Sequence, residues 1–300
     1  RRDALRFSEV AGPILDADAQ AAAAGDRARA QNAVLLARQI LALLLADSVS
    51  EGGLAARAAE RLDSLARAGF VEDTAVLAEL RYRQLQIALL RDDAPRAEAA
   101  IGALEQMGRD SAGRFLDAAD RLAYRRALML WREAPASAAR ADAVVRFGVR
   151  VVQQMDASGQ SASDPAVVST QMIVSDAAAT LWRERRDAEA LHLARRLLRR
   201  ALVAQPRSID LLERSAALAA EAGEWREAAS SWGTLRSGFD FGGTRWARAN
   251  YEYVFALSRH DRDAARREIE QHFRVFPSGG DGEWGARMRA LRDELIGGAG

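Results

Sequence analysis

The stretch that decides the fold spans residues 206–228 and reads PRSIDLLERSAALAAEAGEWREA. Pro206 cannot continue a preceding helix, and Ser208 is a suitable N-cap for a helix that starts at the next residue. Apolar residues then recur at three- and four-residue spacing up to Gly223, a residue suited to the left-handed conformation just past a helix end. The spacing resumes at Trp225, so the pattern predicts two antiparallel helices joined by a short turn.

Four residues around this turn match a known repeat. Gly223, Trp225, Ala228 and Trp232 fall where tetratricopeptide repeats carry a turn glycine, an aromatic residue, a small alanine and a second aromatic residue. The chain therefore resembles a tetratricopeptide-repeat (TPR-like) α-solenoid, and the resemblance covers residues 166–277 and is weaker before them. The alanine has a physical role, because a larger side chain at a helix crossing overpacks the contact by about 1–3 kcal/mol.

The same unit departs from the family pattern at its start and at its end. Leu212 replaces the usual aromatic residue, and Ser215 with Ala216 stands where a Leu-Gly pair is common. Asp240 stands where the closing proline would be. The match is therefore strongest at the central turn.

The rest of the chain can be interpreted as looser copies of this unit, because amphipathic segments and short breakers alternate along it. We expect an all-α protein, and the resemblance implies a right-handed α-solenoid of about six antiparallel helix pairs with a C-terminal capping helix and no sheet. The expected segments are a weakly ordered or helical lead-in broken at Pro13 (1–26), an N-terminal helical-repeat half (27–155), a loop or hinge (156–165), the TPR-like repeats (166–277), and a capping helix with a frayed tail (278–300).

The amino-acid composition argues against several kinds of function and partner. All 43 basic residues are arginine, the 42 acidic residues leave a net charge of +1, and there is no cysteine. This balance argues against strong global attraction to nucleic acid or to a membrane surface, and disulfides and thiolate chemistry are excluded. The most apolar run, residues 33–46, is shorter than a membrane span and contains Arg38, so we expect a buried helix and no transmembrane segment. The absence of lysine and the alanine excess are typical of a GC-rich genome, and we expect a bacterial protein of the cytoplasm or periplasm.

No catalytic motif stands out. The three histidines, His192, His260 and His272, are not at metal-ligand spacing, and the chain has no HExxH, CxxC or GxSxG sequence. Acidic pairs fall in turns, where carboxylates commonly cap helices. We therefore expect a non-enzyme with no catalytic residues, no metal and no cofactor.

One helix carries a stripe of arginines at i and i+4 spacing. The stripe consists of Arg195, Arg196, Arg199 and Arg200. Such a stripe can hold phosphate groups bidentately. It can equally be the solvated outer face of a second helix, whose long side chains cover apolar neighbours, and the scarcity of interleaved aromatics favours this second interpretation.

The TPR resemblance implies that the first helix of each pair lines a concave groove. The groove positions would be Met172, Ser175, Trp182, Glu213, Arg214, Asn250, Tyr251 and Val254. This mixture of apolar, aromatic and polar groups is typical of a binding surface, and the Asn250 amide could hold a peptide backbone. The alternative is that Trp182 and Tyr251 only pack between adjacent repeats.

Three functional hypotheses follow. The first is a non-catalytic scaffold that binds a protein or peptide partner in the groove, a role that rests on fold resemblance. The second is a helical accessory region of a larger enzyme or cell-envelope assembly, a hypothesis motivated by a first residue other than methionine. The third is a binder of RNA or an anionic surface through the arginine stripe, with affinity that falls steeply with salt.

Overall fold

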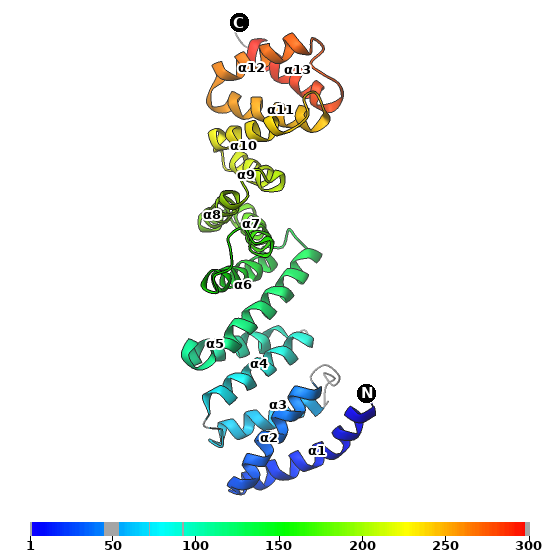
Figure 1. Ribbon diagram of the computed structural model, residues 1–300, viewed down its shortest axis with the longest axis vertical. Helices are drawn as coiled ribbons and strands as arrows, with labels where there is room; N and C mark the ends of the chain where they lie inside the picture. Colours follow the sequence, from blue (N-terminus) through cyan, green and yellow to red (C-terminus); the bar gives the residue numbers. More distant parts are fainter. Residues whose placement is uncertain (1, 45–53, 72, 92, 298–300) are drawn as a thin grey trace. The chain divides into compact units, whose positions relative to one another are not determined.

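A computed structural model describes the chain apart from residues 1, 45–53, 72, 92 and 298–300, and Figure 1 shows its helices. Throughout the described part the chain is all-α and contains no strand, which confirms the all-α part of the prediction. Two compact units divide between Leu130 and Trp131, and each is described separately below.

The first unit is built from five helices. They are α1 (Arg2–Ala23), α2 (Arg27–Leu44), α3 (Leu54–Arg67), α4 (Thr74–Leu90) and α5 (Ala94–Glu133), which continues across the boundary. Helices α1, α2 and α3 pack on one another, and α3 packs on α4. Small side chains such as Ala30, Ala33 and Ala37 are completely buried there, so the helices lie close together.

Two residues of the first unit, Pro13 and Gly108, were expected to interrupt helices, and the structure shows a different outcome for each. Helix α1 continues through Pro13, so the expected break at this residue is wrong. Pro13 is exposed, and water can satisfy the carbonyl that its ring leaves without a partner. Gly108 does end a helix as predicted, because its φ of 73° and ψ of 169° divide α5 into two arms. The second arm starts directly after Gly108 rather than at Phe115.

The predicted buried helix over residues 33–46 is α2 as far as Leu44, and the last two residues of that range lie outside the described part. Ile40 and Leu41 are buried, whereas Leu35 is exposed. None of the described helices combines the length and apolar character needed to cross a membrane.

The second unit continues as a series of helices that pack on their neighbours in the chain. They are α6 (Ala138–Ala157), α7 (Pro165–Arg185), α8 (Ala188–Ala204), α9 (Ile209–Glu221), α10 (Trp225–Gly238), α11 (Thr244–His260), α12 (Arg262–Val275) and α13 (Gly282–Gly297). Contacts join each helix to the next, and α13 also packs on α11. This nearest-neighbour pattern is compatible with a helical repeat. Residues 158–164 connect α6 with α7, which pack against each other within this unit.

The stretch at residues 206–228, on which the fold prediction rests, contains α9 and the start of α10. Gly223 has a φ of 78°, so the left-handed conformation expected past the helix end is present. Ala228 is 0% exposed and Trp232 is 4% exposed, as close packing requires. Ser208 occupies the N-cap position of α9, but its side chain makes no capping hydrogen bond. Helix–turn–helix geometry therefore follows from the turn glycine and the apolar spacing.

Candidate partner-binding pockets

The second unit contains a pocket of about 370 Å³ lined by residues of α10, α11, α12 and their adjoining loops. One wall is aromatic. Phe241, from the loop before α11, lies 4.6 Å from Trp246 and 5.6 Å from Phe276, measured between ring centroids. His272 lies 5.1 Å from Phe276 by the same measure. Phe241 is 66% exposed, so a large apolar ring remains accessible at this pocket.

A chain of hydrogen bonds forms the polar side of this pocket. The Nη1 group of Arg236 donates to Oδ1 of Asn250 at 3.0 Å and to Oε2 of Glu268 at 2.8 Å. Nδ2 of Asn250 lies 3.2 Å from Nδ1 of His272, and Nε2 of His272 lies 3.0 Å from the carbonyl oxygen of Gly279. A carbonyl oxygen only accepts, so these partners assign the proton to Nε2 and let Nδ1 accept from Asn250.

This network explains the position of Asn250, a predicted groove residue that lines this pocket. The side chain is 3% exposed, and both ends of its amide already have partners. Its arrangement orients Arg236 and His272 rather than leaving an open amide for a peptide backbone. The guanidinium of Arg236 also lies 4.2 Å from the ring centroid of Tyr253, which fixes its plane.

Three further predicted groove residues are buried in the helix packing. Ser175 is 1% exposed and donates its hydroxyl to the carbonyl oxygen of Ala194 at 2.9 Å. Trp182 is 9% exposed and Val254 is completely buried. These side chains stabilise the contacts between helices and present no surface to a partner. Met172 is half-buried.

The charged members of the predicted groove form ion pairs between helices. Glu213 of α9 lies 3.6 Å from Arg248 of α11. Arg214 of α9 donates from Nε to both carboxylate oxygens of Asp176 on α7, at 3.0 and 3.1 Å. Burial raises the pKa of Asp176, because the loss of hydration outweighs the hydrogen bonds and charge of Arg214.

Tyr251 belongs to a half-buried aromatic row. Its ring stacks on Phe255 at 5.9 Å and lies 5.7 Å from Trp284 of α13. Arg287 lies over Trp284 at 4.8 Å. Burial raises the pKa of the Tyr251 hydroxyl. These contacts agree with the alternative in which Tyr251 packs between neighbouring helices.

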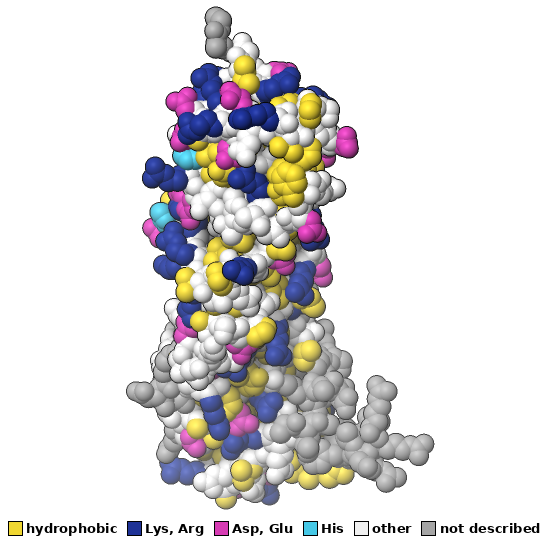
Figure 2. Space-filling model, turned by 45° about the horizontal axis from the view of Figure 1, so that its top comes forward, with side chains coloured by type: hydrophobic (Ala, Val, Ile, Leu, Met, Phe, Trp, Pro, Cys, Tyr) yellow, Lys and Arg dark blue, Asp and Glu magenta, His cyan; other side chains and the backbone are white. Residues whose placement is uncertain are grey.

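Carboxylates neutralise most of the predicted arginine stripe. Arg195 bridges Glu224 and Glu227, with 2.5 Å from its Nη2 to Oε2 of Glu227. Arg200 pairs with Asp156, and Arg199 lies 3.7 Å from Glu227. Burial tends to raise the pKa of Glu227, but the hydrogen bond and charge of Arg195 outweigh it and lower the pKa. Arg196 is exposed and forms no ion pair with any residue that the structure describes. Figure 2 shows arginines and acidic side chains interspersed on the face that it draws.

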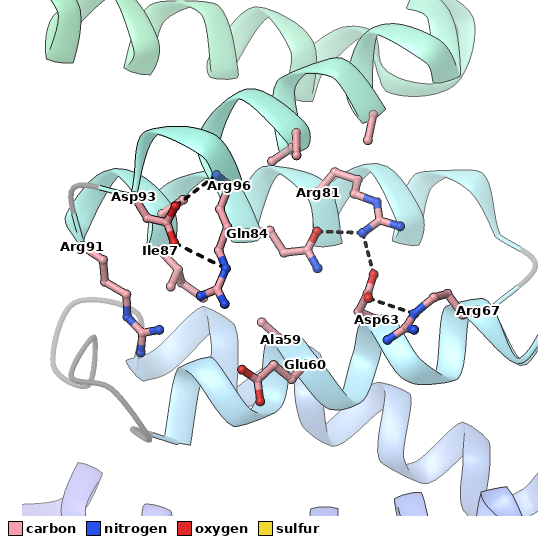
Figure 3. Close-up of a pocket in the computed structure, with 14 residues that line it drawn as sticks. Ala59, Glu60, Asp63, Arg67, Arg81, Gln84, Ile87, Arg91, Asp93 and Arg96 are labelled. Carbon is pink, nitrogen blue, oxygen red and sulfur yellow. Dashed lines mark hydrogen bonds and ion pairs between the residues drawn. The ribbon is translucent and has the colours of Figure 1, made fainter.

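The first unit contains a different pocket, about 320 Å³ in volume, between α3, α4 and the first arm of α5 (Figure 3). Nη1 of Arg81 donates to Oδ1 of Asp63 at 2.6 Å and to Oε1 of Gln84 at 2.8 Å. Nε of Arg67 donates to Oδ2 of Asp63 at 3.1 Å. Burial tends to raise the pKa of Asp63, but the hydrogen bond and charge of Arg81 outweigh it, and the pKa is lowered.

Sequence reasoning missed both pockets as sites. Each draws its lining from three helices, and no spacing along the chain reports which helices meet. In retrospect, a cluster of alanines on facing helices is the sequence signal for the pocket of the first unit. The aromatic residue in the glycine-rich loop at 238–243 is the signal for the pocket of the second unit. Across the described residues, no group of three or more acidic, histidine or cysteine side chains is arranged to hold a metal ion. No protein-family model matches the chain, and no curated protein matches its sequence.

Proposed function

We propose that this chain is a non-catalytic scaffold that binds a protein or peptide partner, built as a right-handed TPR-like α-solenoid. Support for the repeat type comes from α9 and α10, where Gly223, Ala228 and Trp232 occupy the conformation and the buried positions that the family pattern requires. Support for the scaffold role comes from the second unit, where each helix packs on the next along the chain. Repeat proteins stack helices in this way and use the resulting extended surfaces to bind partners.

The observation that carries the proposal is the aromatic wall of the pocket between α10, α11 and α12. Phe241 is 66% exposed and Val275 is 54% exposed, and both line the same pocket. Exposed aromatic side chains next to fixed polar groups are the composition of an interface hot spot. A partner would insert an apolar or aromatic side chain against Phe241 and place polar backbone groups near Glu268 and Gln271. We therefore propose that the partner binds in this pocket rather than at the predicted groove residues. Asn250 supports the pocket through its hydrogen bonds.

The anionic-surface alternative has less support. Arg195 and Arg200 already bind carboxylates, and a phosphate would have to displace them. No observation specifically favours an accessory role within a larger enzyme or envelope assembly.

The test compares two apolar residues of the second unit that are both exposed. Phe241→Asp changes the pocket, whereas Val203→Asp introduces the same charge on α8 at a residue that is 81% exposed. Proteins captured from a lysate by the unaltered chain are quantified by mass spectrometry against those captured by each variant. A captured protein is then purified, and its affinity for all three chains is measured.

We expect Phe241→Asp to weaken binding by about tenfold or more and Val203→Asp to leave it unchanged, as for loss of a hot-spot residue. Melting temperatures must agree among the three chains. Equal affinities for both variants would place the partner elsewhere on the molecule.

A further inference from the structure

We propose that the pocket between α3, α4 and α5 binds a small organic anion, with its carboxylate or phosphate head on arginine side chains and its apolar body on an alanine floor. The site lies in the first unit and is independent of the partner-binding proposal above.

The hollow exists because small residues meet where three helices approach. Ala59 of α3, Ala88 of α4 and Ala100 of α5 are buried at its floor. Ala99 and Ala103 continue the same apolar surface along α5. A methyl group is too short to fill the space between three helices, so a pocket remains where leucines would have closed it. Its volume of about 320 Å³ suits a small molecule.

Guanidinium groups surround this floor from all three helices. Arg67 extends from α3, Arg81 from α4, Arg91 from the C-cap of α4, and Arg96 from α5. In Figure 3, Arg96 reaches down towards α3, with Arg91 on one side of it and Arg81 on the other. The lining contains these four guanidinium groups and three carboxylates.

Donor groups remain after the internal ion pairs are formed. Arg81 uses only Nη1 for Asp63 and Gln84, and its Nε and Nη2 groups bond to no described residue. Arg96 pairs with Asp93 through Nε at 3.4 Å, and its two Nη groups stay available. An arginine with open donors binds carboxylate or phosphate through paired hydrogen bonds.

The acidic residues of the pocket do not favour a cation. Asp63 is bound by Arg81 and Arg67, and Asp93 caps the start of α5 by accepting from the backbone N–H of Arg96 at 3.1 Å. Glu60 is the remaining carboxylate of the lining and has no ion pair with any described residue. Removing its charge should therefore strengthen the binding of an anion, whereas removing an arginine should weaken it.

The experiment is calorimetric titration of the full chain with four probes that share one apolar body. Heptanoate and hexyl phosphate carry the two candidate heads on a hexyl chain, hexanol carries no charged head, and hexyltrimethylammonium carries the opposite charge. We expect one or both anions to bind and the other two probes to fail. The stronger anion distinguishes a carboxylate ligand from a phosphate ligand. Absence of binding by both anions, or equal binding of hexyltrimethylammonium, would overturn the proposal.

Charge variants then locate the site. Arg96→Gln should weaken binding of the stronger anion by about fivefold or more through loss of charge-assisted hydrogen bonds. Glu60→Gln should strengthen it by about twofold through loss of repulsion. The matched control is Arg61→Gln, which removes an arginine from α3 that pairs with Asp16 outside the pocket lining and should change nothing. Shifts of the same sign in the Arg96 and Glu60 variants, or no shift in either, would contradict the assignment.

A third change tests the floor without altering charge. Ala99 is exposed on α5, so Ala99→Leu keeps the helix and fills part of the hollow. We expect the hexyl probe to bind at least about fivefold more weakly, because its body loses its contact surface. Unchanged affinity with an unchanged melting temperature would show that the alanine floor is not the binding surface.

Discussion

The two pockets have similar volumes, about 320 and 370 Å³, but opposite constructions. In the first unit, alanines form the floor and the charged groups lie on a partly solvated rim. In the second unit, aromatic rings form a wall, and the polar groups include Asn250, which is 3% exposed and hydrogen-bonded at both ends. A polar side chain at the rim can change with little effect on the fold, whereas a buried and fully bonded one cannot.

The extent of burial also distinguishes two acid–arginine pairs by the direction in which the pKa of the acid is shifted. Asp63 in the first unit and Asp176 in the second each bind an arginine at close range. Arg81 lowers the pKa of Asp63 despite its partial burial, whereas burial raises the pKa of Asp176 despite Arg214. Hydration lost around the carboxylate decides which effect wins.

The largest expected effect comes from placing the same charge at two alanines. Ala228→Arg puts a guanidinium into a helix crossing that is completely buried and should destabilise the second unit by more than about 4 kcal/mol. Ala99→Arg, on the exposed edge of the first pocket, should change the stability of the first unit by less than about 1 kcal/mol. Urea unfolding with hydrogen exchange reports each unit separately. Equal and small effects would contradict the repeat register that places Ala228 at a crossing.

A smaller effect should follow from replacing an amide in each pocket by leucine. Asn250→Leu leaves Arg236 and His272 without their shared partner and should destabilise the second unit by about 2–3 kcal/mol. Gln84→Leu removes one acceptor from Arg81, which keeps Asp63, and the loss should be under about 1 kcal/mol. Thermal melts of the two variants provide the comparison, and the reverse order would contradict the contrast between a polar side chain at a rim and a buried, fully bonded one.

Removing each paired carboxylate should give opposite pH dependences. The folded pKa of Asp63 is below its unfolded value, so its stabilisation is present above about pH 4 and is lost as pH falls through the folded pKa. Asp63→Asn should therefore destabilise the protein by about 1 kcal/mol at pH 7 and have little effect in acid. The folded pKa of Asp176 is above its unfolded value, so ionisation reduces stability as pH rises through the folded pKa.

Asp176→Asn consequently should not reproduce the loss seen for Asp63→Asn at pH 7, and a small gain in stability is expected. Unfolding free energies at pH 7 and at pH 3 give both differences. A loss at pH 7 as large in Asp176→Asn as in Asp63→Asn would mean that Arg214 outweighs burial.

The smallest expected effect is at the edge of the arginine stripe. The Arg199 side chain is 68% exposed and its nearest carboxylate oxygen, on Glu227, is 3.7 Å away. Arg199→Ala should change the free energy of unfolding by less than about 0.5 kcal/mol. Arg195→Ala is the control, because that side chain is 20% exposed and bridges two glutamates, and it should show the larger loss in the same melt.

The sequence predicted most of the helices and turns, with Pro13 as an exception, but not the surfaces that they create. Gly223 and Gly108 mark real ends because backbone conformation is a local property. The groove residues of α7 could not be separated from its core, because most of that helix is buried and helical spacing then identifies no single open face. Asn250 was singled out for its chemistry, but its partners Arg236 and His272 come from other helices, and only the tertiary packing brings them together.

Gly108 has a consequence for quaternary structure. Its φ of 73° and ψ of 169° are open essentially to glycine alone, although a Cβ at this position would meet nothing within 4 Å. Any other residue would favour one straight helix through the 40 residues of α5, a rod about 60 Å long. Straightening would carry the first arm, with the now buried Ile101 and Leu104, away from its present neighbours. Apolar side chains exposed in this way favour exchange of arms between copies, so substitution of Gly108 is expected to promote domain-swapped dimers.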